Sequence, residues 1–287
     1  MLFLFVIIGS CAKQNNSNEA RYVVLSPEIA EILYSIGVYD EIVGYTEECV
    51  EVKDSTALNN ILSENYTNKN GVETVIVGNF GNISLEKVVA LSPTIVFTSA
   101  LEQNEIATKL NKLKIKTIQM YPSSIKELLE MIDSLGKICE KPTQAEILID
   151  SLLNKFDYFK KLADSRENKP KVFIEIYGNP IMTADNSSYL GKLLELSGGI
   201  NIFPNLVRDY CRVNPEEVVH LNPDIIILTY PGIGTDDVKQ RKGWDNVNAI
   251  KNNKIYTIED INPDFILRAG PRSIIGIENM IKVLYEE

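Results

Sequence analysis

From position 21 onward, short runs of β-branched residues alternate with segments whose apolar positions recur at helical spacing. The run at 21–25 is followed by Ser26 and Pro27, an N-cap and a proline at the first helical position, and Gly37 ends the helix that they begin. Strands separated by helices of about ten residues are typical of parallel βα units, whose ligand-binding face lies at the carboxyl ends of the strands. Further strands are predicted at 41–46, 72–78, 94–99 and 116–121.

A long, mainly helical stretch follows at 122–168. Within it, Pro142 opens an amphipathic segment that continues without interruption for ~22 residues, which gives a helix ~33 Å long, enough to cross a whole lobe. The polar sequence SRENKP then marks a boundary. The apolar residues of this helix are Ile147, Leu148, Leu152, Leu153, Phe156 and Phe159.

After position 171 the strand and helix pattern begins again. It predicts strands at 171–177, 225–228 and 254–258, and helices at 187–196 and 272–284. We therefore expect an α/β fold of two Rossmann-like lobes, each with a central, mainly parallel sheet, joined by one long linker helix. The N-terminal lobe covers 21–121, the linker segment 122–168 and the C-terminal lobe 169–287. One large sheet with a helical insertion is the alternative.

One stretch of sequence occurs twice: NISLEKVVALSPTIVF at 82–97 and RVNPEEVVHLNPDIII at 212–227. Each copy predicts a two-turn helix, a proline that ends it and a buried strand, with Val88, Val89 and Leu91 on the buried face of the first helix. Two lobes of like construction explain most of this identity. The identical positions are Glu86/Glu216, Val88/Val218, Val89/Val219, Leu91/Leu221, Pro93/Pro223 and Ile95/Ile225.

The glutamates and a pair of aromatic residues are not explained by the fold alone. Glu86 and Glu216 occupy the first helical turn, where the helix dipole favours a carboxylate by ~0.3–1 kcal/mol without any partner. Phe80 and Tyr210 each lie six residues before the glutamate, on loops at the expected carboxyl ends of strands. Such a ring either anchors its loop or forms one wall of a cleft between the lobes, and its presence in both copies favours the cleft.

Length and charge narrow the class of protein. A chain of 287 residues with 45% hydrophobic residues can bury a sizeable core and fits about two domains. The formal net charge of −10, with lysines scattered among acids, argues against a nucleic-acid partner, because binding a polyanion requires clustered basic residues.

The first 20 residues have the composition of an export signal followed by a disordered tether. The apolar run ends at Ile8, too short for a bilayer span of ~20 residues. Ile8-Gly9-Ser10-Cys11 resembles the lipobox of bacterial lipoproteins, in which the cysteine becomes the lipidated first residue. We therefore expect an extracytoplasmic protein held at the membrane, or in the periplasm, with Cys11 as the lipidation site.

Three further cysteines, Cys49, Cys139 and Cys211, allow at most one disulfide and leave at least one thiol free. Export would permit a bridge, and the sequence does not choose the pair. Their spacing matches no zinc pattern.

Four segments, SPEIAEILYSIGVYDEIVGYT, NISLEKVVALSPTIV, GWDNVNAIKNNKIYTI and RAGPRSIIGIENMI, together resemble the substrate-binding proteins of ABC importers for iron chelates and cobalamin. The resemblance extends from position 21 to the C-terminus. It implies a monomer without a resident cofactor that holds a cobalamin, siderophore or heme chelate between its lobes and docks on a permease and its ATPase. In that family a surface glutamate on each lobe, here Glu86 and Glu216, contacts permease arginines, which would fix orientation on a two-fold-symmetric partner.

The resemblance also implies a set of ligand-binding residues. Phe80 and Tyr210 match cleft aromatics that flank the corrin ring in cobalamin binders, although tryptophan is common there, and the ligand stays open. Arg268 and Arg272 would be polar anchors, with a structural ion pair at the start of the last helix as the alternative, more so for Arg272. The other candidates are Tyr45, Tyr177, Met182 and, with structural packing as the favoured alternative, Trp244.

Two other classes of protein compete with this interpretation. A carrier of free Zn²⁺ or Mn²⁺ needs several converging imidazoles or carboxylates, whereas the chain has one histidine, His220, within the repeated helix. An α/β enzyme is the second class, but the chain has neither a G-x-S-x-G elbow nor a Gly-rich phosphate loop after the first strand. We therefore predict a binding protein and not an enzyme.

Overall fold

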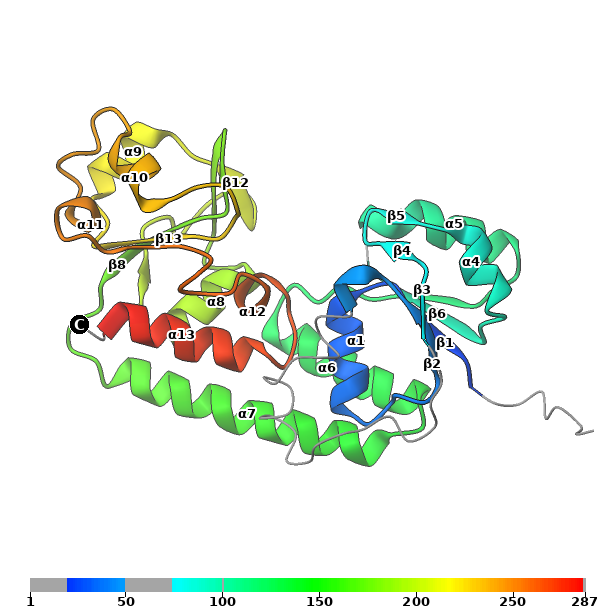
Figure 1. Cartoon of the computed structure of the whole chain (residues 1–287). Helices are drawn as coiled ribbons and strands as arrows, with labels where there is room; N and C mark the ends of the chain where they lie inside the picture. The colour runs from blue at the N-terminus through cyan, green and yellow to red at the C-terminus, as the bar shows by residue number, and fades with distance from the viewer. Residues whose placement is uncertain (1–19, 50–73, 100, 286–287) are drawn as a thin grey trace, which may run out of the picture.

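In the computed structural model, which describes residues 20–49, 74–99 and 101–285, the chain forms two α/β lobes that lie side by side (Figure 1). The long helix α7 (Pro142–Asp164) runs along the same side of both lobes. No helix in the described ranges combines the length and apolar character needed to cross a bilayer. Residues 1–19, which include the predicted lipidation site Cys11, lie outside the described residues.

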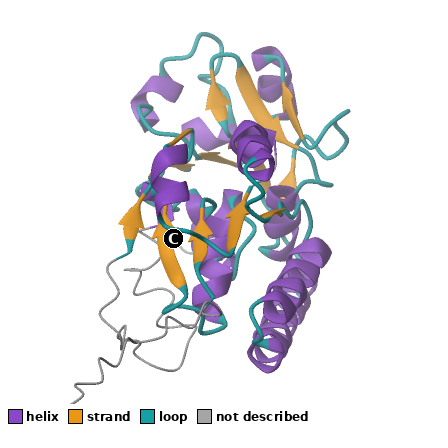
Figure 2. Cartoon of the chain, turned by 90° about the vertical axis from the view of Figure 1, so that its right-hand side faces the viewer, coloured by secondary structure: helices purple, strands orange, loops and turns teal. Residues whose placement is uncertain are grey.

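The N-terminal lobe is built on a five-stranded, fully parallel sheet in the order β3-β2-β1-β6-β7. Figure 2 shows its strands flanked by helices. The central strands are short, β-branched and fully buried, as a sheet covered on both faces requires. The strands are β1 (Tyr22–Val24), β2 (Ile42–Tyr45), β3 (Val75–Ile76), β6 (Ile95–Thr98) and β7 (Thr117–Gln119).

Helix α1 (Pro27–Ser35) follows β1 directly, as its sequence predicts. Ser26 is the N-cap, and its side chain accepts a hydrogen bond from the backbone N–H of Ile29. All nine residues of α1 are buried, including the acidic Glu28 and Glu31. The lobe also contains the hairpin β4 (Gly78–Asn79) and β5 (Asn82–Ile83), helix α4 (Leu85–Ala90), the 3₁₀ turn η1 (Leu101–Gln103) and helix α5 (Asn104–Lys112).

The C-terminal lobe has its own parallel sheet in the order β11-β8-β13-β14. Because the two central sheets are separate, the prediction of two lobes is confirmed and the single large sheet is wrong. The elements of this lobe are β8 (Lys171–Glu175), α8 (Tyr189–Leu196), β11 (Ile200–Asn201), α9 (Pro215–Leu221), β13 (Ile225–Leu228), α10 (Thr235–Lys239), α11 (Asn248–Lys251), β14 (Ile255–Tyr256), α12 (Asp264–Leu267) and α13 (Ser273–Tyr285).

A second, antiparallel sheet of three strands extends this lobe and was not predicted. Its order is β12-β10-β9, with strands β9 (Tyr177–Gly178), β10 (Ile181–Ala184) and β12 (Tyr210–Arg212). Met182 pairs with Tyr177 on one side and Arg212 on the other, and Ala184 pairs with Tyr210. Directly paired residues project from the same face, as do residues two apart along a strand, so these five side chains share one face.

The two copies of the repeat occupy equivalent places in the two lobes. Each is a short helix, α4 or α9, followed by a central strand, β6 or β13. Val88 and Val218 are fully buried, whereas Val89 is 40% exposed, so the prediction that it faces the core is wrong. A helix of six residues has room for one inward-facing turn, and Val89 lies about 100° around the axis from Val88.

Two helices, α6 (Ile125–Ile138) and α7, connect the lobes. Helix α7 has 23 residues and begins at Pro142, in agreement with the predicted long helix. Leu148, Leu152, Phe156 and Phe159 are buried on it, whereas Ile147 and Leu153 point to solvent. The exact limits of the linker segment, 122–168, stay a prediction.

One buried apolar cluster is continuous between the lobes and the connecting helices. It contains Phe97 of the N-terminal sheet, Leu128 of α6, Phe156 of α7 and Ile174 and Leu190 of the C-terminal lobe. A shared core of this kind resists separation of the lobes, because moving one past the other would expose packed apolar surface.

Three cysteines lie in the described part of the chain, and all are free thiols. Cys49 and Cys139 are buried, and burial raises the pKa of Cys49 to about 12 and of Cys139 to about 11. Cys211 is partly exposed on β12. None of the disulfide pairings that the sequence left open is formed in this structure.

Candidate binding cleft

A cavity of about 420 Å³ lies between the lobes. On the N-terminal side its lining comes from the segments that follow strands β1, β2, β6 and β7, so it occupies the carboxyl edge of the parallel sheet, where the strand pattern predicts a ligand. On the C-terminal side it is closed by the segment after α12. The lining residues are Pro27, Glu28, Glu48, Phe80, Ser99, Glu102, Tyr121, Pro122, Leu267, Arg268 and Ala269.

A smaller pocket of about 30 Å³ adjoins this cavity and shares Tyr121, Pro122, Leu267 and Ala269 with it. Tyr189, Asp209 and Tyr210 complete its lining from the C-terminal lobe. Phe80 and Tyr210, the paired aromatics of the repeat, therefore line two adjoining spaces from opposite lobes. We refer to the two spaces together as the cleft.

Hydrogen bonds to its backbone hold Phe80 in place. Both carboxylate oxygens of Glu48 accept from the Phe80 N–H at 2.9 Å, and the side-chain amide of Gln103 donates to the Phe80 carbonyl at 3.3 Å. The turn between β4 and β5 thus presents the half-buried ring to the cavity.

Tyr121 follows β7, is 55% exposed and lines both spaces of the cleft. Burial, and then the negative charges of Glu28, Glu102 and Asp209, raise its pKa, so the phenol stays neutral and able to donate a hydrogen bond. Sequence reasoning missed Tyr121, although its place just beyond a predicted parallel strand was a signal that could have found it.

Tyr210 is more enclosed than Tyr121. It begins β12 and packs against the shared apolar cluster. Burial, and then the neighbouring Tyr121 and Asp209, raise its pKa to about 12. Its ring is therefore both a wall of the cleft and part of the lobe's packing.

Arg268 lines the cavity, as predicted for a polar anchor, but it already has a partner. Its Nη1 donates to Oδ2 of Asp264 at 2.7 Å, one turn earlier in the chain. A ligand that binds this guanidinium must share it with Asp264.

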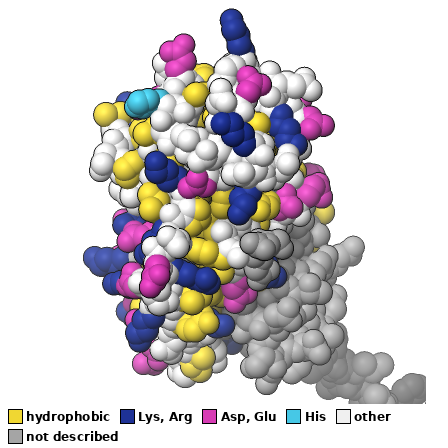
Figure 3. All heavy atoms as spheres, turned by 90° about the vertical axis from the view of Figure 1, so that its left-hand side faces the viewer, with side chains coloured by type: hydrophobic (Ala, Val, Ile, Leu, Met, Phe, Trp, Pro, Cys, Tyr) yellow, Lys and Arg dark blue, Asp and Glu magenta, His cyan; other side chains and the backbone are white. Residues whose placement is uncertain are grey.

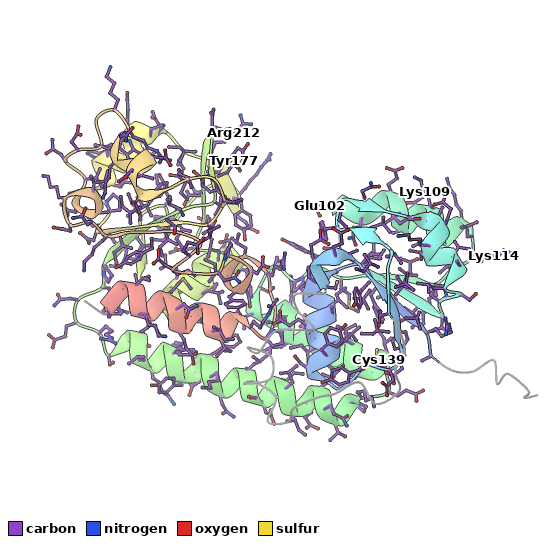
Figure 4. The ribbon with its side chains drawn as sticks, in the orientation of Figure 1. Glu102, Lys109, Lys114, Cys139, Tyr177 and Arg212 are labelled. Carbon is purple, nitrogen blue, oxygen red and sulfur yellow. The ribbon has the colours of Figure 1, made fainter. Side chains whose placement is uncertain are left out.

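Tyr177 and Met182 lie on the shared face of the small antiparallel sheet, together with Tyr210, but neither lines either space of the cleft. Tyr177 is 52% exposed, and its ring lies 6.1 Å from that of Tyr230. Figure 4 shows Tyr177 and Arg212 on the edge of the C-terminal lobe that is turned toward the N-terminal lobe. Glu102 lies on the N-terminal lobe, on the side that faces this edge. The sheet face thus continues the C-terminal wall beyond Tyr210.

Three predicted ligand residues are instead packed inside the lobes. Tyr45 is 7% exposed at the end of β2, in the shared core. Trp244 is 2% exposed, packs edge-on against Phe173 and lies under the guanidinium of Arg241. For Trp244, structural packing was the alternative to ligand binding, and the structure places it in the packing of the lobe. Neither Tyr45 nor Trp244 lines the cleft.

Arg272 is the third, and it joins the lobes. Its Nε donates to Oε2 of Glu31 at 2.8 Å, and its backbone N–H donates to the other carboxylate oxygen. Both side chains are at most 5% exposed. Gly270 makes this approach possible, because a Cβ there would lie 2.9 Å from Oε1 of Glu31. The ion pair connects α1 of the N-terminal lobe to the start of α13 of the C-terminal lobe, so it holds the two lobes together.

The two repeated glutamates point outward. Glu86 is exposed on α4; hydrogen bonds from its own backbone N–H and from the Ser84 hydroxyl lower its pKa, so it is ionised at neutral pH. Glu216 is exposed on α9, where Asn214 caps the helix. The two helices lie on different lobes, both away from α7 (Figure 1).

His220 is also exposed on α9, and so lies apart from the cleft. Figure 3 faces the outer end of the C-terminal lobe and shows acidic and basic side chains scattered over this face, with the chain's single histidine near its upper left edge. Among the described residues, no three His, Cys, Asp or Glu side chains are grouped so as to hold a metal ion.

Two α/β lobes on a shared helix, with a cleft between them, have the architecture of a two-lobed solute-binding protein. The family profile described as periplasmic binding protein matches residues 23–261, and the chain belongs to that family. Its members bind solutes and are not enzymes, so the catalytic alternative is excluded.

Individual relatives extend over nearly the whole chain. The ABC transporter substrate-binding lipoprotein YvrC of Bacillus subtilis is 26% identical over 274 residues, 93% of this chain and 80% of that protein. A vitamin B12-binding protein of Vibrio parahaemolyticus is 24% identical over 280 residues, covering 96% and 93%. The structure of Staphylococcus aureus IsdE complexed with heme shares the fold, with a TM-score of 0.74 and 22% identity over 93% of this chain and all of that one.

Proposed function

We propose that this chain is the extracytoplasmic binding subunit of an ABC importer and that it captures a metal chelate of the cobalamin, heme or siderophore type in its cleft. The observation that carries the proposal is the position of the cleft, at the carboxyl edge of the N-terminal sheet with aromatic rings from both lobes. The relatives support the ligand class, because one is named for vitamin B12 and another binds heme.

Absorption spectroscopy tests this proposal directly, because all three kinds of chelate are coloured. Purified protein should shift the spectrum of at least one of cobalamin, hemin or a ferric siderophore and keep it bound through gel filtration. Retention of none of them would contradict the chelate class.

We further propose that Cys11 carries a lipid anchor and that residues 12–20 tether the lobes to it. The relative YvrC is named a lipoprotein, which supports this assignment. The Cys11→Ser variant should move from the membrane fraction to the soluble extracytoplasmic fraction, and an unchanged distribution would contradict lipidation.

Docking on the permease is proposed to use Glu86 and Glu216. Replacing both with alanine should leave ligand affinity unchanged but lower transport by about tenfold or more, since an interfacial charge pair can contribute ~1.5 kcal/mol or more. The measurement is uptake of the chelate in cells, beside titration of the purified variant.

Glu217→Ala provides a matched control. Glu217 is an exposed acid on the same helical turn as Glu216 but projects about 100° away from it. Uptake that falls equally in Glu217→Ala, or ligand affinity that falls with the double variant, would remove the docking role.

A further inference from the structure

Carboxylates dominate the charged groups of the larger cavity. Glu28, Glu48 and Glu102 line it, against the single guanidinium of Arg268, which is itself paired with Asp264 at 2.7 Å. All three glutamates belong to the N-terminal lobe and follow different strands of its sheet. The N-terminal wall of the cleft is therefore negatively charged.

None of the three glutamates has a cationic partner among the described residues. Glu28 is 6% exposed, and one of its oxygens accepts from the Ser99 hydroxyl at 3.1 Å. Within the described ranges, Glu48 accepts only from the backbone N–H of Phe80. A nearly buried carboxylate that is supported by one neutral donor is poorly compensated, and a positive group brought into the cavity would relieve this.

Aromatic rings stand beside these carboxylates. Phe80 and Tyr121 line the same cavity, and the charges of Glu28 and Glu102 act on the Tyr121 phenol. Rings with negative faces next to carboxylates form the environment in which proteins hold ammonium-type and other delocalised organic cations. An anionic ligand would meet repulsion from the carboxylates and no free arginine in this cavity.

A bare metal ion fits this wall less well than a cationic organic surface. In the part of the chain that the structure describes, the three carboxylates do not converge into a group that could ligate one ion. On the opposite lobe, Arg212 lies exposed on the edge turned toward Glu102 (Figure 4). Arg212 lines neither space of the cleft, and Asp209 of the same lobe lines the smaller pocket, so the three glutamates of the N-terminal wall are the largest group of charges in the cleft.

We propose that the ligand of this cleft is a chelate that carries a net positive charge or a cationic group, and that it presents this group to Glu28 and Glu102 on the N-terminal wall. The inference rests on the proposed function and specifies its ligand class. It predicts discrimination against chelates whose periphery bears carboxylates.

Two forms of one corrinoid provide a matched pair of probes. Aquacyanocobinamide is a monocation, whereas dicyanocobinamide, formed in excess cyanide, is neutral and has the same ring and side chains. We expect the monocation to bind about five- to tenfold more tightly at low salt, and this preference should shrink as salt screens the carboxylates. Hemin, whose periphery bears two anionic propionates, should bind most weakly of the three.

The Glu28→Gln variant should lose most of the preference for the monocation. Glu102→Gln should lose part of the preference for the monocation. Because Glu102 is exposed, this second variant should fold normally even if Glu28→Gln does not. Glu105→Gln, an exposed acid on α5 paired with Lys109, should keep the full preference.

Four outcomes decide between the inference and the proposed function. A preference for the monocation that Glu28→Gln or Glu102→Gln reduces supports both. Equal binding of the two cobinamides, or tighter binding of hemin, overturns the charge inference and leaves chelate capture standing. Calorimetric binding of tetraethylammonium without binding of any chelate supports the charge inference and overturns chelate capture. Absence of binding by all four probes, and by a ferric siderophore, overturns both.

Discussion

Replacing Arg272 with methionine should lower the free energy of unfolding by about 3–5 kcal/mol. The substitution keeps most of the side-chain volume but leaves the Glu31 carboxylate, at most 2% exposed, without the guanidinium that now binds it. An uncompensated buried charge costs more than the ion pair itself contributes, which makes this the largest stability effect that we expect from one side chain. Urea unfolding followed by circular dichroism measures it.

The pH dependence of this variant provides a second readout. Burial raises the pKa of Glu31 above its ordinary value of 4.5, and Arg272 opposes that rise. Without the arginine, the folded chain binds a proton at Glu31 more tightly than the unfolded chain does, so stability falls as the pH rises. The stability deficit of Arg272→Met should therefore shrink when the pH is lowered from about 7 toward about 5.

A double variant separates loss of charge compensation from loss of packing. Glu31→Gln combined with Arg272→Met removes both charges and should recover part of the deficit, because no buried ion is left unpaired. Lys161→Met breaks the exposed pair of Lys161 with Asp157 on α7 and should change stability by less than about 0.5 kcal/mol. A double variant that is less stable than Arg272→Met would show that the deficit does not come from the unpaired charge of Glu31.

The parts of this fold that were predicted are those with strong local signals. The periodicity after Pro142 predicted α7, and the Ser26-Pro27 signal predicted the start of α1, since each depends on residues a few positions apart. The small antiparallel sheet was missed because β9 has two residues and β10 four, too few for an alternating pattern to be distinguished from a loop.

The cleft was predicted less completely than the fold, for a physical reason. Phe80 and Tyr210 were found because the repeat placed them at the same offset. Glu28, Glu48 and Tyr121 are far apart in the sequence, and only the parallel arrangement of β1, β2 and β7 brings them to one cavity. Their residue types alone are ordinary for surface loops, so no local pattern distinguishes them.

The packed candidates show the opposite limit. Trp244 and Arg272 have side chains that could equally bind a ligand or fill an interior. The deciding facts are the contact of Trp244 with Phe173 and of Arg272 with Glu31, across 71 and 241 positions of the chain. Such long-range partners cannot be read from one sequence without the fold, which is why an ion pair remained the alternative for Arg272.

Truncating Phe80 to alanine should weaken binding of the chelate by about 1–3 kcal/mol, roughly 5- to 150-fold, because a ring buried against a ligand contributes on this scale. The substitution should be structurally mild. Glu48 and Gln103 hold the backbone of this turn, so removing the ring leaves its anchors in place. Titration of the purified variant with the chelate that the spectra identify measures the loss.

Tyr121→Ala should have an effect of similar size, because Tyr121 lines both spaces of the cleft and is 55% exposed without ligand. The double variant should lose less than the sum of the single losses, since the two rings line one cavity and share one ligand surface. Tyr210→Ala is a less clean test, because this ring also packs in the shared core and its loss would lower stability as well.

Tyr158→Ala is the matched control for ring removal. Tyr158 is 59% exposed on α7 and lines neither space of the cleft, so its truncation should leave the titration unchanged. If Phe80→Ala and Tyr121→Ala bind the chelate as tightly as the unmodified protein, the N-terminal wall does not hold the ligand. In that case the face shared by Tyr177, Met182 and Tyr210 would become the surface to test, because it continues the cleft on the C-terminal lobe.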